Sequence, residues 1–138
     1  MVTSGLADDE AFFTGVRKVT GALRQRQVDT IKALLAGAAH WPLGWLAYAF
    51  GTAWHECHLE PIHELGGVNY LHRMYDIEGE RPAKARELGN LTPGDGVRYA
   101  GRGLVQLTGK INYERAGGAL GVDLVAEPHK ALEPTIAV

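Results

Sequence analysis

Residues 42–56 read PLGWLAYAFGTAWHE, and this stretch decides the predicted fold. Apolar side chains recur on one face at helical spacing, and Trp45 makes the opposite face apolar as well. A helix that is apolar nearly all round is typical of the centre of a globular protein. Pro42 suits the first helical position, because its missing N–H would be unpaired there. The pattern predicts a central, buried helix that ends near Glu56.

Helical patterns flank this stretch on both sides. Upstream, residues 8–40 are helical in pattern, most clearly where Val28, Ile31, Leu35 and Ala38 recur three and four residues apart. Downstream, a helix is predicted over residues 81–88, ending at Gly89 or Asn90, and another over residues 110–120, closed by Gly121.

The segments between these helices carry turn-forming residues. Residues 57–70 lose the helical period and favour a loop or short hairpin. Residues 89–103 are rich in Gly, Asp and Pro, which fit tight turns. Residues 104–107 favour a short strand. The arrangement predicts an α+β fold that is mainly α, with a large helical lobe and a small β or loop-rich lobe.

Composition and charge narrow the class of protein. The chain has 138 residues, of which 46% are apolar and 22% charged, which suits one compact domain. The formal net charge is -2 and the cations are scattered, so nucleic acid is excluded as a partner. No apolar run reaches the roughly 18 residues of a membrane-spanning helix, so membrane insertion is not expected.

Two features of the sequence indicate the cellular compartment in which the chain is made. The single cysteine, Cys57, excludes an internal disulfide. Residues 1–13, MVTSGLADDEAFF, carry acidic residues where a secretory signal would be basic, and they have no apolar core. We therefore expect synthesis in the cytoplasm, with any target outside the cell reached by another route.

Glu56 is the first candidate for chemistry. It stands at the end of an apolar helix, where desolvation and the negative helix terminus would both favour its protonated form. A carboxylic acid that keeps its proton near neutral pH can protonate the leaving oxygen in glycoside hydrolysis. A capping or ion-paired glutamate is the alternative from position alone.

Several segments together resemble glycoside hydrolase family 19, which includes plant-type chitinases and many phage endolysins. The matching segments are HEC at 55–57, LEPIHELGG at 59–67, GNLTPGDGVRYAGRGLVQLTGKINY at 89–113 and GVDL at 121–124. Residues 12–35, FFTGVRKVTGALRQRQVDTIKALL, are also similar to the N-terminal helices of the phage enzymes. The resemblance implies a lysozyme-like fold forming a single catalytic domain over residues 1–138. Family members continue with at least one more helix, so this domain is expected to be truncated at its C-terminus.

The resemblance also assigns roles to particular residues. It implies that Glu56, beside His55, is the general acid and that Glu64 is the general base. Thr108 would help to hold the attacking water. The expected substrate-binding residues are His55, Gln106, Asn112, Tyr99 and Arg102. Family members invert the anomeric centre by single displacement, which needs two carboxylates roughly 6.5 to 9.5 Å apart.

Alternatives remain for several of these roles. Glu60, Glu78 and Glu80 compete with Glu64 as the base. Thr108 could be only the N-cap of the helix that follows it. Arg102 could fix its loop instead of binding substrate, and Tyr99 and Tyr113 could stack on sugar rings or pack in the core. The three tryptophans are expected to pack.

The neighbourhood of Glu56 departs from the family pattern and suggests other enzyme classes. Cys57 and His58 stand where many members have Thr and Gly. Histidines crowd this stretch, including His63, but the zinc-protease pattern needs His at position 59, which is Leu. A Cys57 nucleophile paired with a histidine is possible on composition. No metal or cofactor is expected, and the glycine spacing of residues 101–110 fits no phosphate-binding loop.

The predicted substrate is the glycan backbone of peptidoglycan, cleaved as in an endolysin that lyses bacteria. Chitin has the same β-1,4-linked N-acetylhexosamine backbone and is the alternative, as is an inactive module that only binds glycan. Peptidoglycan is favoured because the resemblance is to the phage branch and because neither a signal peptide nor disulfides are indicated. A monomer is expected, and it would reach the cell wall through a holin-type pore.

Overall fold

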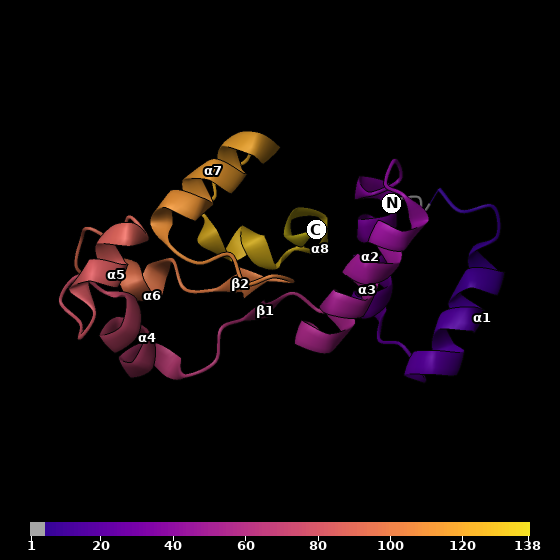
Figure 1. Ribbon diagram of the computed structural model, residues 1–138, viewed down its shortest axis with the longest axis horizontal. Coiled ribbons are helices and arrows are strands. Elements are labelled where there is room, and N and C mark those ends of the chain that lie inside the picture. The colour runs from indigo at the N-terminus through magenta and orange to yellow at the C-terminus, as the bar shows by residue number, and fades with distance from the viewer. Residues whose placement is uncertain (1–4) are drawn as a thin grey trace. The chain divides into compact units, whose positions relative to one another are not determined.

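A computed structural model describes residues 5–138, and helices dominate it (Figure 1). Residues 1–4, part of the N-terminal segment discussed above, lie outside the described residues. The chain divides into two compact units: residues up to Glu60 together with Val138, and residues Pro61–Ala137. The prediction of a mainly helical α+β fold is confirmed. The single domain and the lysozyme-like pairing of two lobes stay predictions.

From residue 5 onward, the first unit contains three helices: α1 (Asp9–Thr20), α2 (Gln25–Gly37) and α3 (Leu43–Cys57). The Asp8 carboxylate caps α1 by accepting from the N–H of Ala11 at 2.9 Å. The apolar face predicted for α2 is confirmed, since Ile31, Leu35 and Ala38 are buried. The helical prediction for residues 8–40 therefore holds, with an interruption between α1 and α2.

The central, buried position predicted for α3 is wrong within this structure. Its ends agree with the prediction, but only Ala53 and Cys57 of this helix are buried. The side chains of Leu43, Trp45 and Tyr48 are 81%, 68% and 79% exposed, so Trp45 does not pack as expected. The physical reason is that two helices, α1 and α2, cannot enclose a third on all sides.

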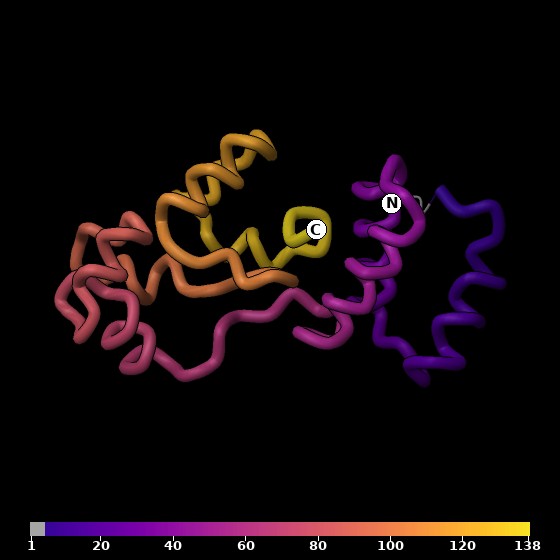
Figure 2. The backbone as a smooth tube through the Cα atoms, in the orientation of Figure 1, coloured from indigo at the N-terminus to yellow at the C-terminus, as the bar shows by residue number. Residues whose placement is uncertain are grey.

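The second unit contains the short strands and the remaining helices. Its elements are β1 (Ile62–His63), α4 (Gly67–Tyr75), α5 (Pro82–Glu87), α6 (Asp95–Arg98), β2 (Arg102–Gly103), α7 (Lys110–Leu120), the 3-10 helix η1 (Pro128–Leu132) and α8 (Pro134–Ala137). The two strands pair antiparallel, with Ile62 opposite Gly103 and His63 opposite Arg102. The backbone tube shows β1 and β2 side by side although they lie about 40 residues apart in the chain (Figure 2).

Glycine ends the predicted helices of this unit. Gly89 follows α5 with φ 73°, and Gly121 caps α7 with φ 67°, conformations that glycine adopts without strain. Both helices therefore confirm their predictions. The strand predicted over residues 104–107 is wrong: residues 104–106 form a turn, with Gln106 at φ 58°, and only Leu107 bridges back to Arg102.

The core of the second unit lies under α7. Tyr99, Tyr113, Leu124 and Ala131 form a buried cluster there. Because α7 packs on this cluster, the residues just before the helix are held at a fixed place. None of the helices among residues 5–138 has both the length and the apolar content to cross a membrane.

Candidate active site

Three predicted site residues of the second unit converge on one glycine. A Cβ atom built on Gly101 would lie 2.8 Å from Gln106 Oε1, 2.9 Å from Glu64 Oε2 and 3.0 Å from Thr108 Oγ1. All three side-chain oxygens therefore surround the space that a side chain at position 101 would fill. Gly101 is buried, and its φ is not in the left-handed region, so glycine is needed there for room.

Glu64 is held by its backbone and by both carboxylate oxygens. Its N–H donates to the Gly101 carbonyl at 2.7 Å, directly beyond the end of β1. Glu64 Oε2 accepts from the N–H of Gly101 at 3.2 Å, and Oε1 accepts from the Tyr75 hydroxyl at 2.8 Å. The side chain is half-buried. An oriented, partly accessible carboxylate of this kind suits a general base.

Thr108 and Asn112 form the next part of the site. The Thr108 hydroxyl donates to the Gln106 carbonyl at 2.9 Å, and the Asn112 amide donates to the Thr108 carbonyl at 2.7 Å. Helix α7 begins at Lys110 with Gly109 as its N-cap, without a side-chain capping bond. The alternative reading of Thr108 as that N-cap is therefore wrong. Its hydroxyl and the carboxylate of Glu64 instead border the same space beside Gly101.

Gln106 uses its amide nitrogen for structure and turns its oxygen to the site. Nε2 donates to the carbonyls of Ile62 at 3.1 Å and Gly103 at 3.3 Å, so the side chain ties its turn to β1 and β2. Its left-handed backbone is uncommon for a residue with a side chain and is often found at functional sites. The remaining Oε1 can accept a hydrogen bond from a sugar hydroxyl or amide.

The three competitors for the base are placed differently. Glu60 pairs with the Arg24 guanidinium in the first unit. Glu80 is exposed and lies 3.8 Å from Arg73, and Glu78 is exposed. Among the four candidates, Glu64 is the one that shares its surroundings with Gln106 and Thr108.

Arg102 and Tyr99 have structural partners. Arg102 Nη1 donates to the carbonyls of Arg98 and Ala100 and to the Tyr113 hydroxyl, at 2.9, 3.2 and 2.9 Å. These bonds give Arg102 the loop-fixing role, and its contact with substrate stays a prediction. Tyr99 is only 3% exposed and packs against Tyr113, so its expected stacking on a sugar ring is corrected to a role in the core.

Glu56 and His55 lie in the last turn of α3, in the first unit, and both side chains are exposed. The burial expected for Glu56 is therefore not provided by its own unit. The helix ends at His58, whose φ of 52° is left-handed. This conformation gives a physical reason for the glycine that many family members carry at this position.

The two alternative chemistries around Glu56 are disfavoured. Cys57 is buried, its thiol donates to the Ala53 carbonyl at 3.1 Å, and burial raises the pKa of the thiol. A reactive cysteine needs the opposite surroundings. Among residues 5–138, the group of ligand-type side chains within 4.8 Å of one another is His72, Asp76 and Glu78, which includes no histidine near Glu56.

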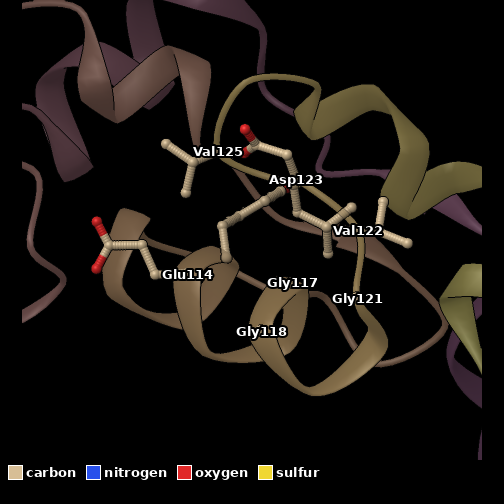
Figure 3. A pocket seen from close by; sticks show the side chains of 9 residues that line it. Glu114, Gly117, Gly118, Gly121, Val122, Asp123 and Val125 are labelled. Atoms are coloured by element: carbon tan, nitrogen blue, oxygen red, sulfur yellow. The ribbon is translucent and has the colours of Figure 1, made fainter.

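A separate pocket of about 300 Å³ is lined by residues of α7 and of the loop that follows it. In Figure 3 the glycines of α7 form its floor, and Val122 and Val125 face them from the following loop. Glu114 and Asp123 stand at its rim. None of its lining residues belongs to the group around Gly101.

Comparison with known proteins finds a similarity to one family in the C-terminal part of the chain. Residues 74–138 match the sequence profile of glycoside hydrolase family 19, described as class I chitinase. This part of the chain, just under half of its length, is therefore similar to glycoside hydrolase family 19. The family 19 match contains Gly101, Gln106, Thr108 and Asn112, while Glu56 and Glu64 precede it.

Individual chitinases are similar to parts of this chain. Chitinase 8 of Oryza sativa subsp. japonica is 63% identical over 30 residues, which cover 22% of this chain and 12% of the rice protein. Chitinase 11 of the same species is 58% identical over 38 residues, covering 28% and 14%. The crystal structure of chitinase C from Streptomyces griseus HUT6037 is similar with a TM-score of 0.45 and 22% identity, covering 91% of this chain and 49% of that one. The chain thus spans about half the length of that solved relative.

Proposed function

We propose that this protein is an inverting glycoside hydrolase that cleaves β-1,4 bonds between N-acetylhexosamine units, with Glu64 as general base and Glu56 as general acid. The observation that carries the proposal is the convergence of Glu64, Thr108 and Gln106 on Gly101. A carboxylate, a hydroxyl and an amide oxygen there can hold a water beside its base and accept a bond from the sugar.

The reaction follows from these groups. The Glu64 carboxylate takes a proton from the water as the water oxygen bonds to the anomeric carbon. The bond between that carbon and the leaving oxygen breaks, and the leaving oxygen takes the proton of Glu56. The Thr108 hydroxyl orients the water, and Asn112 fixes the backbone of Thr108. A β-linked substrate then releases an α product.

Peptidoglycan is the substrate that we propose, in an endolysin-type role. The similarity of residues 12–35 to the N-terminal helices of phage enzymes supports this choice. Chitin is the second candidate, because the two rice relatives and the Streptomyces protein are chitinases by name. Both polymers offer the same backbone, so the site around Gly101 suits either.

One experiment separates these candidates. The chain is incubated in parallel with purified peptidoglycan sacculi and with insoluble chitin, and the products are analysed by mass and by NMR of the new anomeric proton. We expect muropeptide fragments with an α reducing end at first release. Release from chitin alone would select the second candidate, and binding to either polymer without release would indicate a module that only binds glycan.

The general acid is tested in the same assay. Replacing Glu56 by Gln removes the proton donor and keeps the shape, so turnover should fall roughly 10²- to 10⁴-fold. Because Glu56 is exposed, the free energy of unfolding should change by less than about 0.5 kcal/mol. Turnover close to that of the original protein in a folded Glu56→Gln variant would refute this role.

A further inference from the structure

The hydroxyl of Tyr75 has no role in the sequence-derived site, yet it is bonded to the predicted base. We infer that Tyr75 is a positioning residue that holds the Glu64 carboxylate toward the water beside Thr108. The inference rests on the proposed function, since it concerns how the base of that reaction is oriented. Its first support is the 2.8 Å hydrogen bond from the Tyr75 hydroxyl to Glu64 Oε1.

Tyr75 can only donate in this hydrogen bond, because its phenol stays protonated. Burial raises the pKa of Tyr75, and the hydrogen bond to Glu64 and the negative charge of Glu64 raise it further. The phenol therefore keeps its proton at any pH at which the protein would act, and it can only donate to the carboxylate. With Oε1 engaged by Tyr75, the second oxygen, Oε2, is left facing Thr108 and Gln106.

The backbone of Tyr75 is fixed by a buried amide. Tyr75 is the last residue of α4, and its carbonyl accepts from Asn90 Nδ2 at 3.0 Å. Asn90 is fully buried, and its Oδ1 accepts from the N–H of Lys110 at 3.0 Å. The same side chain thus ties the end of α4 to the start of α7, where Thr108 and Asn112 are placed.

The next residue, Asp76, fixes Tyr75 from the other side. Its carboxylate is fully buried and accepts from the backbone N–H groups of Gly94, Gly96 and Glu78 at 2.8, 3.0 and 3.2 Å. Gly96 packs so closely that a Cβ there would lie 2.7 Å from the carbonyl carbon of Tyr75. The turn-rich segment that includes Gly94 and Gly96 therefore holds the backbone of Tyr75 and Asp76 in place.

The closing experiment compares Tyr75→Phe with Glu64→Gln, with the double variant, and with Tyr48→Phe as a matched control. Tyr48 is exposed on α3, so Tyr48→Phe removes a hydroxyl without touching the site. The kcat and KM of each variant are measured with purified sacculi, or with chitin if the protein cleaves only that polymer. The carboxyl ¹³C resonance of Glu64, assigned by its loss in Glu64→Gln, is recorded for each folded variant.

We expect Tyr75→Phe to lower kcat about 10- to 100-fold, the value of a hydrogen bond to a charged group, with KM within about twofold. The Glu64 resonance should shift in Tyr75→Phe and not in Tyr48→Phe. In the Glu64→Gln background, Tyr75→Phe should cause less than about a twofold further loss, because the base it orients is absent.

Each other outcome is decisive. If Glu64→Gln keeps full turnover, the proposed function fails, and the inference fails with it. If Glu64→Gln is inactive but Tyr75→Phe keeps full kcat, only the inference is overturned. An equal loss from Tyr75→Phe in both backgrounds would mean that Tyr75 acts through the fold and not through Glu64, and an unshifted Glu64 resonance would show that the hydrogen bond is absent.

Discussion

Gly96 and Gly101 lie five residues apart in the same loop-rich segment, and both are buried where a side chain would not fit, but their neighbours differ in kind. A Cβ on Gly96 would lie 2.5 Å from the backbone nitrogen of Asp76. A Cβ on Gly101 would meet the ends of three side chains instead. Backbone cannot move aside cheaply, whereas side-chain ends can.

The surroundings of Gly96 support the fold, whereas those of Gly101 can take part in a reaction. Beside Gly96, both carboxylate oxygens of Asp76 already accept hydrogen bonds from backbone N–H groups. Around Gly101 the facing groups are polar side-chain oxygens with remaining capacity to accept or to hold a water. The first glycine therefore allows close packing of backbone on backbone, and the second glycine leaves room beside the three side-chain oxygens.

The largest expected effect on stability is that of Gly96→Ala. Because the added methyl group meets the backbone of Tyr75 and Asp76, we expect a loss of about 3 kcal/mol or more in the free energy of unfolding. Chemical denaturation monitored by circular dichroism measures it. A loss below about 1 kcal/mol would show that the backbone of Tyr75 and Asp76 can move aside. Gly96 would then not differ from Gly101 in the way described above.

The next effect is that of Asp76→Asn. Burial alone would raise the pKa of Asp76, but the N–H groups of Glu78, Gly96 and Gly94, with His72 at 3.8 Å, hold the pKa below its ordinary value of 3.8. An asparagine offers one acceptor oxygen to three donors, so we expect a loss of roughly 2 kcal/mol at neutral pH.

The sign of the pH dependence follows from the lowered pKa of Asp76. Its contribution to stability is fully present above the unfolded value and is lost as the pH falls below about 4, toward the folded value. The difference in unfolding free energy between the original protein and Asp76→Asn should therefore shrink between about pH 4 and pH 2. A difference that stays constant over this range would contradict the role given to the Asp76 charge.

The smallest expected effect on stability is that of Gly101→Ala, and it should be the most damaging to activity. The methyl group displaces the side-chain ends of Glu64, Gln106 and Thr108, at a cost of about 1 kcal/mol in unfolding free energy. Turnover should fall more than about 100-fold, because misplacement by about 1 Å can cost that much. A folded Gly101→Ala variant with normal turnover would remove this glycine from the site.

The sequence could predict the elements that end in glycine. Gly89 and Gly121 close α5 and α7, where the pattern places them, because their left-handed backbones favour that residue. The helix α4 is not predicted, although Val68, Leu71 and Tyr75 recur at helical spacing, because the pair Gly66 and Gly67 before it indicates a loop.

The candidate site shows a similar division. The family resemblance names Glu64, Gln106 and Thr108, which the structure brings together, although their roles stay predictions. It could not indicate Tyr75, because a hydroxyl that reaches a carboxylate eleven residues away leaves no periodic signal. The exposure of Glu56 also escaped prediction, since an apolar pattern indicates that a helix can be buried, not what covers it.

The role of Glu64 as general base is the central claim, and chemical rescue tests it most directly. Glu64→Gln is assayed on a substrate with an activated leaving group, with and without azide at high concentration. We expect turnover to fall roughly 10²- to 10⁴-fold with little change in glycan affinity, because the base acts mainly in the transition state. Azide, which needs no base, should partly restore cleavage and give the α-glycosyl azide, inverted from the β-linked substrate. Turnover that is unchanged in Glu64→Gln, or a rescued product of β configuration, would contradict the claim.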